Sequence, residues 1–60
     1  MFKNGKSYSM LLDSKLINFK VISYNAHSGI VAAHHKGTMI QLIININQID
    51  EVELKSIREI

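Results

Sequence analysis

The chain has 60 residues, no cysteine and a formal net charge of +2 at pH 7. This length allows one domain, residues 1–60, and the absence of cysteine excludes disulfides and thiolate zinc sites. The hydrophobic fraction of 47% argues against intrinsic disorder, and the mild positive charge is compatible with an anionic partner.

The apolar runs of the sequence are too short to cross a membrane. The longest lies in residues 39–46 and is interrupted by Gln41 and Asn45, whereas a spanning helix needs about 20 apolar residues. The first residues, MFKNGK, lack the apolar run of a signal peptide. We therefore expect a cytoplasmic protein without a membrane partner.

Residues 7–12 form the first predicted strand. Apolar side chains alternate with serines there, which favours a strand with one buried face. The end of this segment, residues 10–13, would equally fit one turn of helix, so both structures stay open. The Asn4-Gly5 pair just before it is a strong hairpin signal, because both residue types tolerate a positive φ.

Residues 16–25 form the second predicted strand. Ile17, Phe19 and Val21 share one face, and Ile22 and Tyr24 lie on the opposite face. A strand with one face in water would carry polar residues on that second face. Apolar residues on both faces therefore indicate a second burial surface.

Two further strands are predicted around the glycines of the central segment. Gly29 and Gly37 are turn signals, and the third strand, residues 29–36, lies between them. The fourth strand, residues 38–47, alternates most clearly, and its many β-branched residues disfavour a helix. Its core face consists of Ile40, Leu42, Ile44 and Ile46. Its other face still offers Met39 and Ile43.

The last segment completes an all-β prediction. Residues 47–50 predict one 3₁₀ turn that folds Ile49 back onto the core. Residues 51–57 alternate again and predict a fifth strand, with Val52 and Leu54 pointing inward. The fold class predicted from these elements is all-β, a small five-stranded SH3-like or Sm-like barrel.

The apolar residues outside the predicted core favour a homo-oligomer. A single core at this chain length supplies only about 3–5 kcal/mol, so small domains often gain stability by association. Exposed apolar patches usually mark such association sites. We therefore predict an oligomer interface that contains Ile22, Met39 and Ile43. The alternative is a sharply curved strand that serves two halves of one core.

Residues 42–54, LIININQIDEVEL, resemble the second motif of Sm-like proteins, the family of the bacterial RNA chaperone Hfq. That motif is an apolar strand, a tight turn and a short strand with a buried aliphatic residue. In the family the turn carries Arg-Gly or Lys-His, which contact RNA; here Asn45, Ile46 and Asn47 stand at the corresponding positions. The resemblance implies an Sm-like barrel, ring assembly through edge strands and RNA binding.

A basic surface with one aromatic residue is the candidate nucleic-acid site. Proteins that bind single strands combine positive charge along the backbone with aromatic stacking of the bases. The predicted site consists of Lys15, Lys20, Tyr24, Lys36, Asn45 and Asn47. The alternative is that these lysines are solvated and protect sheet edges from pairing.

His27, His34 and His35 are the only candidates for a metal site. Adjacent strand residues point to opposite faces, so His34 and His35 cannot easily hold one ion within a chain. We expect no metal and no other cofactor. No nucleophile elbow, phosphate loop or metal-ligand spacing is present, which favours a protein without catalysis.

Two functions stay open at the level of the sequence. The first is binding of RNA or single-stranded nucleic acid by an oligomeric Sm-like barrel. The second is a small interaction or inhibitor protein of the type found in phages, which captures a host protein or a small nucleotide.

Overall fold

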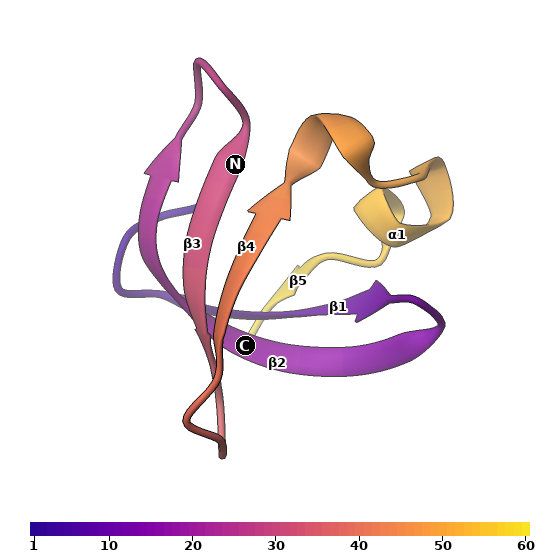
Figure 1. The fold of residues 1–60 in the computed structure, drawn as a ribbon. Coiled ribbons are helices and arrows are strands. Elements are labelled where there is room, and N and C mark those ends of the chain that lie inside the picture. Colours follow the sequence, from indigo (N-terminus) through magenta and orange to yellow (C-terminus); the bar gives the residue numbers. More distant parts are fainter.

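The computed structural model, which describes all 60 residues, contains five antiparallel strands in one sheet and one short α-helix (Figure 1). The strands are β1 (Ser7–Leu12), β2 (Lys15–Asn25), β3 (Ile30–His35), β4 (Gln41–Asn45) and β5 (Arg58–Glu59). A 3₁₀ helix, η1 (Ile46–Gln48), and the α-helix α1 (Glu51–Lys55) connect β4 to β5. The strand order is β4-β3-β2-β1-β5, so β4 and β5 are the sheet edges and no pairing joins them.

The first four predicted strands are confirmed, with small shifts at their ends. Residues 7–12 are a strand and not a helical turn. The fourth strand is shorter than predicted because the turn before it extends to residue 40. The Thr38 hydroxyl donates to the His35 carbonyl oxygen (2.9 Å) and accepts from the Ile40 N–H (3.1 Å). Ile40 therefore lies in this turn and is exposed, which corrects its predicted place in the core.

The hairpin between β1 and β2 turns at Asp13 and Ser14. Both residues have a positive φ, 51° and 67°, which is typical of the primed turns that suit a twisted hairpin. The Asn4-Gly5 pair forms a turn, closed by a bond from the Lys6 N–H to the Lys3 carbonyl oxygen (3.2 Å), but it does not join two strands. This turn leads the N-terminal residues back over the core.

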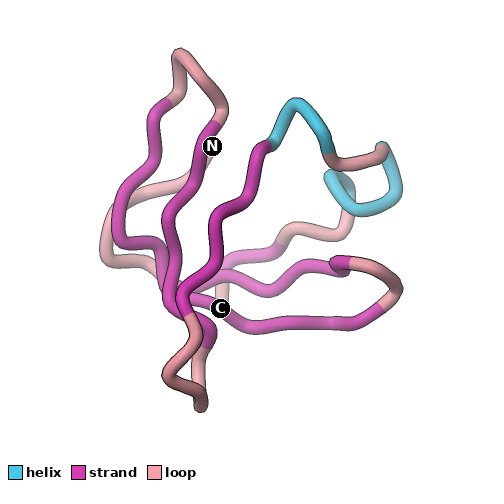
Figure 2. The backbone as a smooth tube through the Cα atoms, in the orientation of Figure 1, coloured by secondary structure: helices cyan, strands magenta, loops and turns pink.

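The sheet is strongly curved (Figure 2). The core lies on its inner face and is built around aromatic side chains. Phe19 is fully buried, and its ring lies 6.0 Å from that of Phe2 and 6.1 Å from that of Tyr8. The alternation along β2 predicted Phe19 on an apolar face of the strand, whereas no predicted strand included Phe2. The buried apolar residues are Phe2, Tyr8, Met10, Phe19, Val21, Val31, Ala33 and Ile44.

A bulge in β2 changes which side chains face the core. Val21 pairs with Ala33 and Ser23 pairs with Ala32, so Ile22 is an extra residue in the ladder. The extra residue reverses the alternation and turns Tyr24 onto the core face, where its ring meets that of Phe2 edge-on at 5.5 Å. The prediction that Tyr24 faces away from the core is therefore wrong, whereas Ile22 is half exposed as expected.

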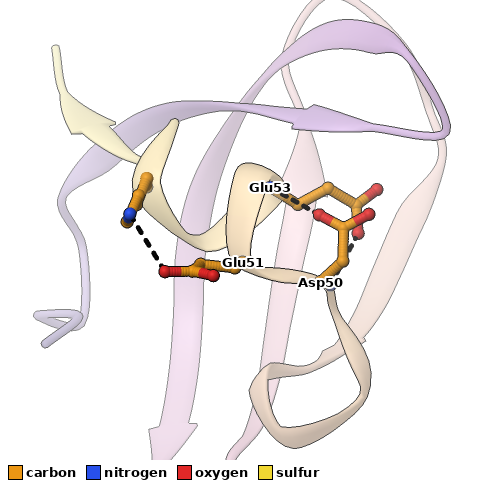
Figure 3. A network of polar contacts seen from close by, with 4 residues as sticks. Asp50, Glu51 and Glu53 are labelled. Carbon is orange, nitrogen blue, oxygen red and sulfur yellow. Dashed lines mark hydrogen bonds and ion pairs between the residues drawn. The ribbon is translucent and has the colours of Figure 1, made fainter.

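The predicted fifth strand, residues 51–57, is wrong in its first part, which is the helix α1. Asp50 and Glu53 form a capping box: the Asp50 carboxylate accepts from the Glu53 N–H (2.7 Å), and the Glu53 carboxylate accepts from the Asp50 N–H (3.2 Å) (Figure 3). Val52 accordingly points to solvent, and β5 begins only at Arg58. The predicted 3₁₀ turn is confirmed one residue earlier, and Ile49 packs against the core. Neither helical segment has the length and apolar character needed to cross a membrane.

Glu53 also ties α1 to the hairpin between β1 and β2, since its second carboxylate oxygen accepts from the Asp13 N–H (3.0 Å). We expect Glu53→Ala to lower the free energy of unfolding by about 1–2 kcal/mol, because two backbone N–H groups lose their acceptor. Glu51→Ala removes only the exposed ion pair with Lys55 and should change it by less than about 0.5 kcal/mol. Urea denaturation followed by circular dichroism measures both values. Equal destabilisation by the two variants would contradict the bridging role of Glu53.

Candidate nucleic-acid interface

The outer face of β2, β3 and β4 carries three rows of side chains that run across the strands. Side chains directly opposite in such ladders lie about 5 Å apart and act as neighbours. The register places the members of each row on adjacent strands. The rows are Lys20, His34 and Gln41; then Ser23, Ala32 and Ile43; then Asn25, Ile30 and Asn45.

Apolar side chains gather at the middle row, because the bulge places Ile22 beside Ser23 on β2. Ile43 is 71% exposed on β4, and the bulge residue Ile22 is 50% exposed on β2, with Ala32 of β3 between them. Two of the three predicted interface residues therefore share one patch, which we call the apolar row (Ile22, Ala32 and Ile43). Met39 is 95% exposed but lies outside this row, in the turn between β3 and β4.

The first row is basic and adjoins the turn that carries Lys36. Lys20 and His34 are direct neighbours across β2 and β3. The Lys36 N–H donates to the Asn18 carbonyl oxygen (2.9 Å), which holds this turn against β2. Since β2 is a central strand, Lys20 does not protect a sheet edge from pairing. We call Lys20, His34 and Lys36 the basic end of the outer face.

Negative charge is segregated from this face. Residues 14–49, which include all of β2, β3 and β4, contain neither aspartate nor glutamate. The carboxylates lie instead in the hairpin turn between β1 and β2, around α1 and on β5; they are Asp13, Asp50, Glu51, Glu53 and Glu59. No carboxylate on β2, β3 or β4 is therefore available to pair with the basic end.

The other predicted nucleic-acid residues lie elsewhere. Asn45 and Asn47 stabilise the opposite end of β4: the Asn45 carbonyl oxygen Oδ1 accepts from the Asn47 N–H (2.9 Å), and Asn47 Nδ2 donates to the Ser28 carbonyl oxygen (3.2 Å). Lys15 starts β2 beside the Asp13–Ser14 turn. Tyr24 packs on the core face, so its ring does not accompany Lys20. The structure thus brings together only Lys20 and Lys36 of the predicted set.

The contact between Asn47 and Gly29 can be tested directly. Gly29 has a φ of +77°, and a Cβ atom there would lie 2.8 Å from Asn47 Nδ2. Gly37 has a similar φ of +81° but open space around it. We expect Gly37→Ala to cost about 1–2 kcal/mol from backbone strain alone, and Gly29→Ala to cost more because the asparagine must also move. Thermal unfolding compares the two; an equal loss would show that the Asn47 contact contributes nothing.

The three histidines are not grouped at one place within the chain. His34 lies in the outer basic row, His35 pairs with the buried Phe19, and His27 lies in the turn between β2 and β3. The prediction that His34 and His35 lie on opposite faces is therefore confirmed. No group of three or more histidine, aspartate or glutamate side chains is arranged to hold a metal ion.

Comparisons with protein-family models, with curated proteins and with solved structures find no match to this chain. The resemblance of residues 42–54 to Sm-like proteins therefore stays a prediction. The candidate interface is therefore supported only by the strand register, the side-chain exposure and the charge distribution of this chain.

Proposed function

We propose that this protein is a self-associating domain without catalytic activity that binds RNA or single-stranded nucleic acid at the basic end of its outer face. The observation that carries this proposal is the charge segregation: Lys20, His34 and Lys36 lie together, and their strands contain no carboxylate. A surface of that kind attracts the phosphate backbone of a nucleic acid.

Self-association and nucleic-acid binding use adjoining parts of the same face. The apolar row is the natural centre of an interface, since interface centres are depleted of charge and the rims are polar. The basic end then lies at the rim, where the lysines of neighbouring copies add to one another. Linking several weak phosphate-binding ends in one assembly raises the overall affinity.

An Sm-like or SH3-like barrel is the architecture that we propose for each copy. Supporting features are the 3₁₀ helix that directly follows β4 and the return of the chain to pair β5 with β1. The helix α1, placed between η1 and β5, is a departure from the strand, turn and strand pattern of the resemblance.

Charge reversal at Lys20 tests the binding site. We expect Lys20→Glu to weaken binding of a fluorescein-labelled oligouridine by about tenfold or more, because every copy loses a phosphate contact and gains a repulsive charge. Lys55→Glu is the matched control: it makes the same change in net charge, but at α1, beside Glu51. Fluorescence anisotropy at low salt gives both affinities. Equal weakening by the two variants, or no binding by the unmodified protein, would contradict the proposal.

A further inference from the structure

The outer edge of β4 carries unpaired backbone groups. The His35 N–H donates to the Ile40 carbonyl oxygen (3.0 Å), and the Ile46 N–H donates to the Gly29 carbonyl oxygen (2.9 Å). Because bonding alternates along an antiparallel strand, Leu42 and Ile44 also face β3. Gln41, Ile43 and Asn45 therefore direct their N–H and C=O groups to the open side of the sheet.

A groove runs beside this open edge. It has a volume of about 320 Å³ and lies between β4, the hairpin turn of β1 and β2, and the start of α1. Its apolar lining consists of Leu12, Ile43, Ile44 and Ile49, and Asp13 and Glu53 supply carboxylates. A second hollow of about 290 Å³ shares these two carboxylates. We call the first hollow the β4 groove.

The two edges of the sheet are protected differently. Natural edge strands usually carry charged residues, proline or a bulge, or are very short, which prevents pairing with another chain. β5 is protected in this way, since it has two residues and both are charged. β4 has five residues, QLIIN, without charge, proline or bulge. The sequence of β4 is thus typical of an edge that a partner strand covers.

We propose that an extended segment of a partner protein adds to β4 as a further strand, and that its groove-facing positions, every second residue, carry both apolar and basic side chains. Its backbone pairs with Gln41, Ile43 and Asn45, and its apolar side chains enter the β4 groove. Its basic side chains meet Asp13 and Glu53, which gives the charge complementarity that selects the partner.

A second copy of this chain fits the groove poorly. It has two free edges: β5 offers only two residues for pairing, and β4, QLIIN, has no basic side chain to meet Asp13 and Glu53. The Arg58 side chain is also folded back, since its Nη1 donates to the carbonyl oxygens of Lys55 (2.8 Å) and Ile57 (2.9 Å). The cationic group that would match the carboxylates of the groove is therefore already engaged. This proposal shares Ile43 with the apolar row, but it does not depend on nucleic-acid binding at the basic end.

Amide hydrogen exchange measured by NMR tests the strand pairing. The probe is a blocked synthetic peptide in which lysine and valine alternate at every second position, with threonine between them, and its control is the peptide with glutamate in place of lysine. We expect the lysine peptide to slow exchange of the Ile43 amide by about tenfold or more, while the Ile44 amide, already paired with β3, changes little. Asp13→Asn, which suits the positive φ at this position, should weaken peptide binding about two- to fivefold.

Three results would overturn the proposal. The first is peptide binding that leaves the Ile43 amide unprotected, or the absence of any binding. The second is equal binding of the glutamate peptide. The third is protection of the Gln41, Ile43 and Asn45 amides by protein concentration alone, which would show that strand pairing with a second copy, and not side-chain contact through the apolar row, occupies the edge. Oligouridine should leave the Ile43 amide unprotected, so failure here and failure of nucleic-acid binding are distinguished.

Discussion

Replacement of Phe19 by alanine should leave the protein largely unfolded at 25 °C. The Phe19 ring is fully buried at the centre of the core, against Phe2 and Tyr8. Truncation of a buried phenylalanine costs about 3–5 kcal/mol, and a single core in a chain of this size supplies only about 3–5 kcal/mol. The loss therefore equals the stability available to one copy. Far-UV circular dichroism and urea denaturation measure the outcome.

Leu16→Ala is the matched control for Phe19→Ala. Leu16 lies on the same strand, β2, but its side chain is exposed. Its truncation creates no cavity, so the variant should unfold at nearly the same urea concentration as the unmodified protein. A Phe19→Ala protein with an equally cooperative transition at that concentration would contradict the assigned core.

Replacement of Ile43 by aspartate should convert the assembly to monomers. In the proposed oligomer the Ile43 side chain is buried as part of the apolar row, where an aspartate would have to lose its hydration without a partner. In a single copy the same side chain is 71% exposed, so folding should be little affected. Light scattering coupled to size-exclusion chromatography gives the mass, and circular dichroism confirms that the variant is folded.

Val52→Asp is the control for the association experiment. Val52 is 69% exposed on α1, nearly the same fraction as Ile43, but it lies away from the outer face of β2, β3 and β4. Aspartate is also tolerated in the first turn of a helix. We expect this variant to keep the mass of the unmodified protein. Loss of assembly in both variants, or in neither, would show that the apolar row is not the interface.

The strands could be predicted because their alternation dominates the local sequence. Phe19 and Val21 occupy the core as the period of two requires. The strand pattern failed at two places: a bulge interrupts β2, and α1 replaces the first part of the predicted fifth strand. The bulge at Ile22 moved Tyr24 to the core face, and bulges depend on the partner strand, which a single pattern does not reveal.

The helix α1 was missed although a sequence signal for it exists. An aspartate followed three residues later by glutamate is the signature of a capping box, and Asp50 and Glu53 have this spacing. The alternation of Val52 and Leu54 predicts a strand, and over such a short segment it is equally compatible with a helix. The hairpin turn at Asp13 and Ser14 has a weaker sequence signal, since neither residue is glycine.

Residue types alone defined only part of the candidate interface. Lys20 could be predicted from its positive charge, and Ile43 from its apolar side chain on the strand face opposite the predicted core residues. The proximity of Lys20 to His34 comes from the pairing register, which fixes neighbours that are distant in sequence. Residue types alone also do not reveal the local hydrogen bonds of the two asparagines: Asn45 caps η1, and Asn47 Nδ2 donates to the Ser28 carbonyl oxygen.

Sedimentation velocity of the protein mixed with fluorescein-labelled oligouridine at low salt tests the central proposal most directly. We expect the labelled RNA to sediment together with several copies of the 6.8 kDa chain. Protein that sediments as single 6.8 kDa chains beside free RNA would contradict both the association and the nucleic-acid binding proposed for this face.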